Sequence, residues 1–113
     1  MDIRKVNDAF SVCDQIGADN LALISSLGYK SIICNRPDGE AEFQPLFGDL
    51  RHLAEQNDMK MVYLPIAATG PTRTDAGTFA QIYKGLPKPV LAYCRTGNRS
   101  MATWTAAMEM NTH

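Results

Sequence analysis

Residues 89–100 read Pro89-Val90-Leu91-Ala92-Tyr93-Cys94-Arg95-Thr96-Gly97-Asn98-Arg99-Ser100 and carry the strongest structural signal in the chain. The apolar run that ends at Cys94 predicts a buried strand over residues 89–94. Residues 95–98 form a tight loop with one glycine, and a helix is expected from Arg99 to about Met110. A buried strand that leads into a helix through a short loop is typical of a parallel sheet covered by helices.

The remainder of the chain repeats this alternation of strand and helix. Short apolar or β-branched runs bounded by turn residues predict further strands, and apolar residues at helical spacing predict helices. The helix that follows Thr72 has Asp75 in capping-box position. Because strands joined by helices form right-handed parallel crossovers, we expect an α/β fold with a four-stranded, mostly parallel sheet flanked by helices. The expected strands are 10–13, 30–34, 60–65 and 89–94, and the expected helices are 19–27, 45–57, 72–83 and 99–110.

Length and composition restrict the class of protein. The chain has 113 residues, of which 45% are hydrophobic and 20% charged, and we expect one domain over residues 1–113. The formal net charge of −1 gives no general attraction for nucleic acid or for an anionic membrane. No apolar run approaches the roughly 20 residues that span a bilayer, and residues 1–6 lack the apolar core of a secretory signal.

Three cysteines stand at Cys13, Cys34 and Cys94, with no CxxC pair and no metal-like spacing to a histidine. We therefore expect no disulfide framework, no metal, no other cofactor, and a cytoplasmic location. Cys34 ends an apolar run and is interpreted as a core residue. The role of Cys13 stays open, because its spacing does not support a resolving thiol.

The loop after Cys94 has the composition of an anion-binding site. Gly97 permits backbone conformations closed to other residues, so successive N–H groups can converge on one point. The N-terminus of the following helix adds unpaired N–H groups and its positive dipole end. Because a thiol in this position loses its proton readily, we predict that Cys94 is an ionised nucleophile reachable from water. The alternative is an inert cysteine buried at a strand end.

Several neighbouring side chains are candidate substrate ligands. Arg99 can hold an anion bidentately, and Ser100 can cap the helix or donate a hydrogen bond to the sulfur. Arg95 is expected to steer and hold the substrate, whereas Arg36 either assists from the neighbouring loop or is a solvated turn residue. The residues expected to bind substrate are Arg95, Thr96, Gly97, Asn98, Ser100 and Arg36, with Cys94 and Arg99 as the catalytic pair.

The segment from Cys94 to Ser100 resembles the active-site loop of rhodanese-type sulfurtransferases. A longer pattern comprises Ile33-Cys34-Asn35-Arg36-Pro37-Asp38-Gly39-Glu40, Tyr63-Leu64-Pro65-Ile66, Gly70-Pro71-Thr72 and Leu91-Ala92-Tyr93-Cys94. This pattern resembles the phosphatase-like domain family of beta-lactamase-hydrolase-like proteins, which is also met fused to metallo-hydrolase-type persulfide dioxygenases. The resemblance implies a fold similar to tyrosine and dual-specificity phosphatases, and members carry both phosphatase-like and sulfur-transferase labels.

Two features bear on the choice between sulfur transfer and phosphatase chemistry. Tyrosine-phosphatase-like enzymes carry five residues between cysteine and arginine, whereas here residues 95–98 are four, and a smaller cradle suits the outer sulfur of a persulfide. Phosphomonoester cleavage also needs a general acid. The candidates are Asp75, in a capping position, and Asp38, in a turn.

We predict a rhodanese-like sulfurtransferase that moves sulfane sulfur from thiosulfate or a persulfide through a Cys94 persulfide. The alternative is a phosphatase-like hydrolase of phosphomonoesters that forms a phosphocysteine at Cys94. Two non-enzymatic hypotheses also stay open: reversible oxidation of Cys94 as a sensor, and plain binding of a phosphorylated ligand. The expected partner is a small anion, and methionines on one face of the last helix would allow a homodimer.

Overall fold

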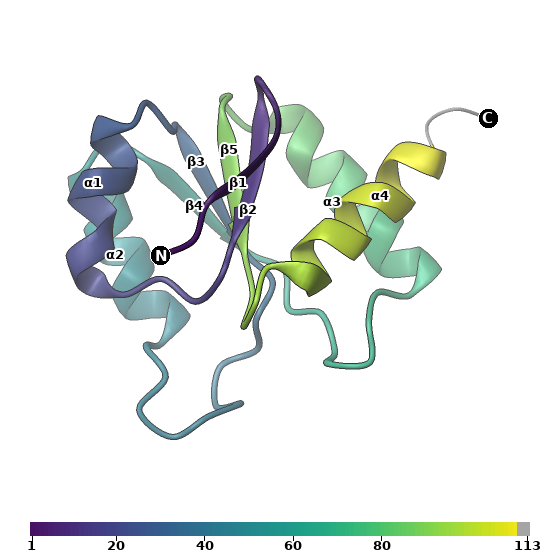
Figure 1. Ribbon diagram of the computed structural model, residues 1–113, viewed down its shortest axis with the longest axis horizontal. Coiled ribbons are helices and arrows are strands. Elements are labelled where there is room, and N and C mark those ends of the chain that lie inside the picture. The colour runs from purple at the N-terminus through teal and green to yellow at the C-terminus, as the bar shows by residue number, and fades with distance from the viewer. Residues whose placement is uncertain (111–113) are drawn as a thin grey trace.

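The computed structural model describes residues 1–110 and contains a five-stranded sheet in the order β1-β2-β5-β3-β4. Strands β2, β5, β3 and β4 run parallel, and β1 pairs antiparallel with the edge of β2 (Figure 1). Strand β5 therefore occupies the centre of the sheet. The strands are β1 Arg4–Asn7, β2 Phe10–Cys13, β3 Ser31–Cys34, β4 Lys60–Tyr63 and β5 Val90–Tyr93.

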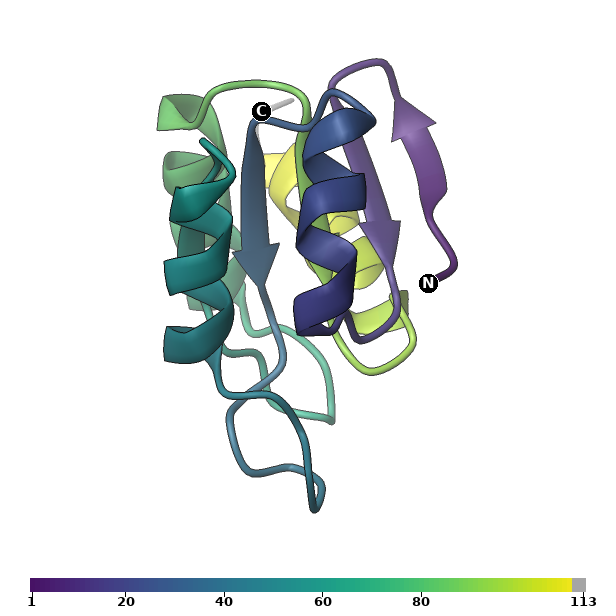
Figure 2. The same cartoon turned by 90° about the vertical axis from the view of Figure 1, so that its left-hand side faces the viewer.

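Helices cover both faces of the sheet (Figures 1 and 2). Because successive side chains of a strand point to opposite faces, Leu91 and Tyr93 pack in the cluster beneath α1 and α2, whereas Val90 and Ala92 pack in the cluster beneath α3 and α4. Every residue of β2, β3 and β5 is buried, as expected of strands covered on both faces. The helices are α1 Leu21–Ser26, after a 3₁₀ turn at Ala18–Asn20, α2 Phe47–Gln56, α3 Arg73–Gly85 and α4 Asn98–Met110.

Aromatic side chains fix α3 and α4 against the sheet. Phe10 of β2 stacks on Trp104 of α4 with ring centroids 4.1 Å apart, and it meets Phe79 of α3 edge-to-face at 5.9 Å. Such pairs contribute beyond the apolar area that they bury. Since α4 begins at Asn98, this packing also fixes the far end of the loop that starts at Cys94.

The predicted α/β fold with a mostly parallel sheet and flanking helices is confirmed, but the sheet has one strand more than the four expected. The additional strand is β1, whose Arg4-Lys5-Val6-Asn7 sequence is mostly exposed and has neither an apolar run nor a regular alternation. Edge strands are often short and charged, because such strands resist pairing with other chains. Among residues 1–110, no helix has both the length and the apolar character needed to cross a bilayer.

Candidate active site

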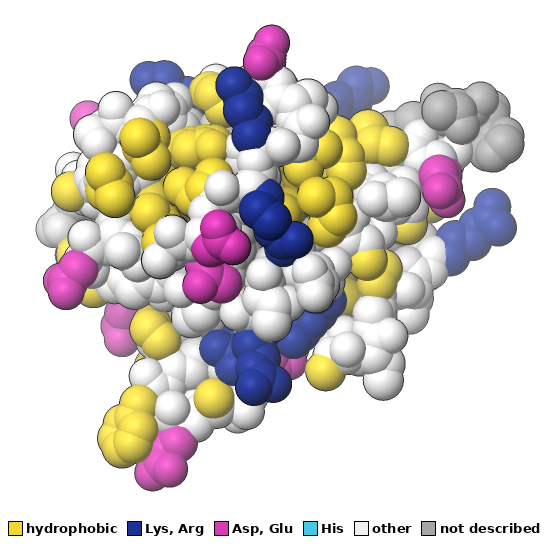
Figure 3. Space-filling view, viewed as in Figure 1, with side chains coloured by type: hydrophobic (Ala, Val, Ile, Leu, Met, Phe, Trp, Pro, Cys, Tyr) yellow, Lys and Arg dark blue, Asp and Glu magenta, His cyan; other side chains and the backbone are white. Residues whose placement is uncertain are grey.

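Cys94 directly follows β5, the central strand, and the loop after β3 lies at the same edge of the sheet. The carboxyl ends of parallel strands are where α/β folds hold their ligands. Pairing of β3 with β5 brings the loop that carries Arg36 beside the loop that follows Cys94. Several Lys and Arg side chains gather over this end of the molecule, in the lower middle of Figure 3.

The main chain after Cys94 curls around the sulfur. The Gly97 N–H donates a hydrogen bond to Cys94 Sγ at 3.1 Å, and Gly97 adopts a φ of 94°, which a residue with a side chain rarely adopts. Burial alone raises the pKa of Cys94, but hydrogen bonds from the main chain of Ser100, Thr96, Gly97 and Arg99 outweigh it, so the pKa lies below its ordinary value. The predicted convergence of amides on the sulfur is therefore present.

The exposure of Cys94 differs from the expectation. The residue is 1% exposed, so its sulfur lies at the floor of the loop. The prediction that this sulfur is open to water is therefore wrong. The cause is the position of Cys94 at the end of the central strand, where chain packs on both sides. A reacting group must therefore be small enough to enter the loop and reach the sulfur.

Arg99 lies in the first turn of α4 with its guanidinium held by two acceptors. Its Nη1 donates to Glu40 Oε2 and to the Ile66 carbonyl, both at 2.8 Å, and its Nη2 donates to Glu40 Oε1 at 3.1 Å. A guanidinium has five N–H donors. The Nε–H and the second Nη2–H lie on the same edge of the guanidinium and have no partner among the described residues. This edge can receive two oxygens of an anion.

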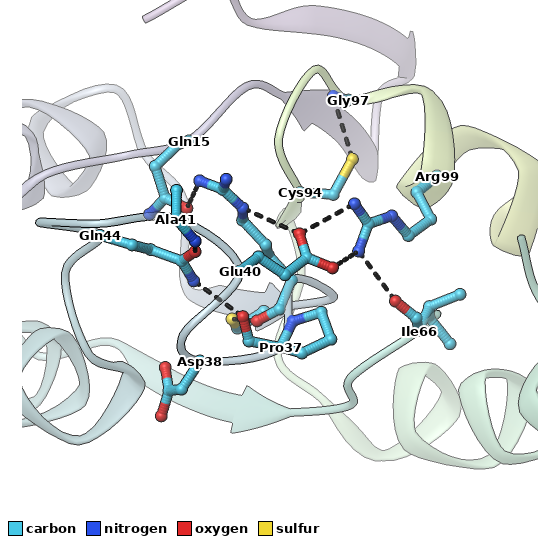
Figure 4. A network of polar contacts seen from close by, with 12 residues as sticks. Gln15, Pro37, Asp38, Glu40, Ala41, Gln44, Ile66, Cys94, Gly97 and Arg99 are labelled. Atoms are coloured by element: carbon cyan, nitrogen blue, oxygen red, sulfur yellow. Dashed lines mark hydrogen bonds and ion pairs between the residues drawn. The ribbon is translucent and has the colours of Figure 1, made fainter. Parts of the chain in front are cut away.

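Glu40 is a site residue that the sequence analysis missed. Its carboxylate accepts from Arg99 (Figure 4) and also from Arg36, whose Nε donates to Glu40 Oε1 at 3.1 Å. Hydrogen bonding to Arg99, together with Arg36, lowers the pKa of Glu40 against the effect of its partial burial. Glu40 is thus ionised and holds both guanidinium groups in place. Its signal in the sequence is weak: an acidic residue four positions after Arg36 in a turn.

Arg36 is a member of this network and not a solvated turn residue. It is 7% exposed, and its Nη1 donates to Gln15 Oε1 at 3.1 Å. Gln15 also donates its backbone N–H to the Arg95 carbonyl at 3.4 Å. The loops after β2, β3 and β5 are therefore joined by polar contacts.

The Ser100 hydroxyl was expected to cap the helix or donate to the sulfur, and that prediction is wrong. Ser100 Oγ donates instead to Asn35 Oδ1 at 2.9 Å, and Asn35 Nδ2 donates to the Leu64 carbonyl at 2.9 Å. Both Ser100 and Asn35 are fully buried, so this pair ties α4 to the end of β3. Only the main chain of Ser100 acts on the sulfur.

The other predicted ligands occupy different positions around the loop. Thr96 Oγ1 accepts the Asn98 N–H at 3.2 Å and closes the turn. Arg4 Nη2, from β1, donates to the Thr96 carbonyl at 3.1 Å and to Asn98 Oδ1 at 3.3 Å. The side chain of Arg95 is exposed and forms no hydrogen bond or ion pair within residues 1–110, so it is free to meet an incoming anion.

Both candidate general acids are committed elsewhere. Asp75 Oδ2 accepts the Thr72 N–H at 2.9 Å, and Thr72 Oγ1 accepts the Asp75 N–H at 3.0 Å, which confirms the predicted capping box. Asp38 Oδ1 accepts the Phe47 N–H at 2.9 Å at the start of α2, and its carboxylate points away from Cys94 (Figure 4). Each carboxylate therefore already accepts a main-chain N–H at the start of a helix, and their role as general acids stays a prediction.

The comparison with known families agrees with this arrangement. Residues 2–110 match the family model described as "Beta-lactamase hydrolase-like protein, phosphatase-like domain". The chain belongs to this family. A beta-lactamase hydrolase-like protein of Agrobacterium fabrum is 28% identical over 100 residues, which are 88% of this chain and 23% of that protein. The chain thus spans about a quarter of the length of this relative.

Solved structures of phosphatases share the fold. The structure of a protein named a putative phosphatase from Neisseria meningitidis Z2491 is 37% identical, with a TM-score of 0.83 over 88% of this chain and 71% of the other. The kinase associated phosphatase, solved with its catalytic-site cysteine replaced by serine, has a TM-score of 0.75 at 17% identity, covering 89% of this chain and 65% of that one. These comparisons favour the phosphatase-like alternative and give no support to the predicted sulfurtransferase.

Proposed function

We propose that this domain hydrolyses phosphomonoesters through a phosphocysteine at Cys94. The observation that carries the proposal is the pairing of an amide-ringed thiol with the open Nε–Nη2 edge of Arg99. A sulfur nucleophile and a bidentate site for two phosphoryl oxygens are the two parts that such a reaction requires. Membership of a phosphatase-like family supports the same reading.

The reaction has two steps. The Cys94 thiolate attacks phosphorus, an S–P bond forms, and the P–O bond to the leaving group breaks with its electron pair on the leaving oxygen. Water then attacks the phosphocysteine, the S–P bond breaks, and the thiolate is restored as phosphate leaves with the oxygen of that water. Arg99 would stabilise the negative charge of the equatorial oxygens in both steps, and Glu40 would keep Arg99 oriented.

The positions of Asp38 and Asp75 restrict the substrate class. Because each carboxylate accepts a main-chain N–H at the start of a helix, the proposed reaction takes no proton from either side chain for the leaving oxygen. Esters of acidic alcohols such as nitrophenol should therefore react much faster than alkyl phosphates, since their anions leave unaided. The low exposure of Cys94 also favours a phosphoryl group on a slender stem.

The test is hydrolysis of a series of aryl phosphates with leaving groups of increasing pKa. We expect kcat/KM to fall steeply along the series, to vanish in Cys94→Ser, and to stay within about twofold in Asp38→Asn and Asp75→Asn, because neither acid takes part. A ³²P-labelled cysteine in acid-quenched enzyme would identify the intermediate. A flat leaving-group dependence, or equal turnover in Cys94→Ser, would contradict the proposal.

Sulfur transfer remains a second candidate because of one specific observation. Residues 95–98 provide four residues between Cys94 and Arg99, one fewer than tyrosine-phosphatase-like loops, and a sulfite leaving group needs no acid. Formation of thiocyanate from thiosulfate and cyanide, with a 32-Da gain on Cys94 by mass spectrometry, would favour this reaction over phosphate ester hydrolysis.

The small anion remains the proposed partner, whichever reaction applies. All three cysteines are free, which is compatible with the proposed cytoplasmic location. A homodimer through α4 also stays a proposal: Met101 and Met108 pack towards the core, and Met110 is 37% exposed.

A further inference from the structure

Arg4 lies on β1, the edge strand that the sequence did not predict, and it reaches the main chain of the Cys94 loop. Its Nη2 donates to the Thr96 carbonyl at 3.1 Å and to Asn98 Oδ1 at 3.3 Å, across 92 residues of sequence to Thr96. Figure 2 shows the start of β1 and the loop between β5 and α4 at the same end of the sheet. The edge strand β1 therefore places the positively charged Arg4 side chain against the outer side of the Cys94 loop.

The peptide unit between Thr96 and Gly97 connects Arg4 with the sulfur. This peptide bond is trans, so its C=O and its N–H point in opposite directions. Arg4 binds the carbonyl end, while the N–H end, which belongs to Gly97, donates to Cys94 Sγ at 3.1 Å. A rotation that released the carbonyl from Arg4 would also turn the N–H away from the sulfur.

We propose that Arg4 is a positioning residue for Cys94, because its guanidinium holds the Thr96 carbonyl outward and thereby aims the Gly97 N–H at the sulfur. A cationic donor on the carbonyl also polarises the amide, which strengthens the hydrogen bond at its other end. Position 97 fits this role as well, since a Cβ there would overlap Arg4 Nη2. Glycine leaves the space that the guanidinium occupies.

This role deepens the proposed function, because the same thiolate is its nucleophile, yet it is measurable without any substrate. The other charged groups of the network are Arg36 and Arg99, which both bind Glu40. Glu40 and Arg99 lie on the far side of Cys94 from Gly97 in Figure 4, whereas the side chain of Arg4 binds Thr96 and Asn98. An effect of Arg4 on the thiol can therefore be separated from theirs.

The experiment measures the rate of Cys94 alkylation by iodoacetamide as a function of pH, with the modified peptide identified by mass spectrometry. In Arg4→Met the Thr96 carbonyl loses its guanidinium partner, so the Gly97 N–H is no longer held toward the sulfur. We expect the pH midpoint of alkylation to rise and the alkylation rate at pH 7 to fall about five- to tenfold. This is the effect of weakening one hydrogen bond to a charged group. The effect is limited because Arg4 is exposed to water.

Lys5→Met is the matched control. Lys5 lies next to Arg4 on the same strand, carries the same charge, and pairs only weakly with exposed Asp8 at 3.4 Å. We expect its alkylation profile to stay within about twofold of the parent. An equal shift in both variants would assign the effect to net charge and overturn the proposal.

An unchanged profile in folded Arg4→Met would also overturn it. If that variant fails to fold, Arg4→Gln keeps a polar side chain on the edge strand but is too short to span to Thr96, and an unchanged profile there is equally decisive. Because no phosphate ester enters the assay, a failure of the phosphatase proposal leaves this result intact, and the reverse also holds.

Discussion

Cys13 and Cys34 make an instructive contrast with Cys94, because all three cysteines lie at the ends of neighbouring parallel strands. Cys13 and Cys34 are the last residues of β2 and β3, and the register places each beside Tyr93 of β5. Burial raises the pKa of Cys13 to about 12 and also raises that of Cys34. At Cys94 burial acts in the same direction, but the amides of the following loop reverse the outcome.

This contrast assigns the lowered pKa of Cys94 to the main chain that follows it. Neither the residue type nor the strand end distinguishes the three positions. The same register also makes a disulfide between Cys13 and Cys34 implausible, since the two strands flank β5. Their Cα atoms are then separated by about 9.5 Å, two strand spacings, which exceeds the roughly 7 Å that a disulfide can bridge.

The largest expected effect comes from exchanging the three cysteines one at a time. Cys94→Ser should lower kcat for an aryl phosphate by about 10⁴-fold or more, because the nucleophile is lost. Cys13→Ala and Cys34→Ala should keep kcat within about threefold and lower only the free energy of unfolding, by about 1–2 kcal/mol, through small cavities. The measurements are steady-state kinetics and urea unfolding. A comparable loss of kcat in Cys13→Ala would remove the distinction between the strands.

The next-largest effect concerns Gly97, which lies in the loop that gives Cys94 a lower pKa than Cys13 and Cys34. Gly97→Ala should lower kcat/KM by at least about tenfold, because a displaced loop no longer aims its amides at the sulfur. It should also destabilise the protein more than Gly28→Ala. Gly28 has a similar positive φ of 98°, but a Cβ there meets nothing within 4 Å, whereas at Gly97 it meets Arg4 and the Cys13 main chain.

Gly28→Ala therefore measures the cost of the left-handed backbone alone, about 1–2 kcal/mol of unfolding free energy. The additional loss of unfolding free energy in Gly97→Ala measures the steric overlap of the new Cβ with its neighbours. Urea unfolding of both variants gives the two values. Equal costs together with unchanged turnover in Gly97→Ala would show that the loop tolerates a side chain and that Arg4 does not constrain it.

The smallest effect is the pH dependence of stability that Cys13 imposes. Its folded pKa is raised above the unfolded value of 9.0 to about 12, so its contribution to stability is complete below pH 9 and is lost as the pH rises towards 12. At pH 10 the loss should be about 1 kcal/mol. Cys13→Ala should therefore show a shallower decline of the free energy of unfolding between pH 8 and 10.5 than the parent protein. Parallel declines in the two proteins would mean that Cys13 is not the buried neutral thiol described above.

Local sequence was sufficient wherever the structure depends on neighbours along the chain. The apolar run before Cys94, the glycine in the loop, and the Thr72–Asp75 capping box were all predicted, because each involves residues within a few positions of one another. Strand β1 was missed, since its polar sequence forms a strand only by pairing with β2. The Ser100–Asn35 hydrogen bond was missed because it joins residues 65 positions apart.

The position of Cys94 in a short, glycine-containing loop between a buried strand and a helix, and a mostly parallel sheet, followed from sequence alone. The charged side chains that meet this loop follow instead from how distant segments pack together. The bridge from Glu40 to Arg99 spans 59 residues and the contact from Arg4 to Thr96 spans 92. Both depend on the strand order β1-β2-β5-β3-β4, because β3 lies beside the central strand and β1 lies one strand beyond β2, and no local pattern fixes that order.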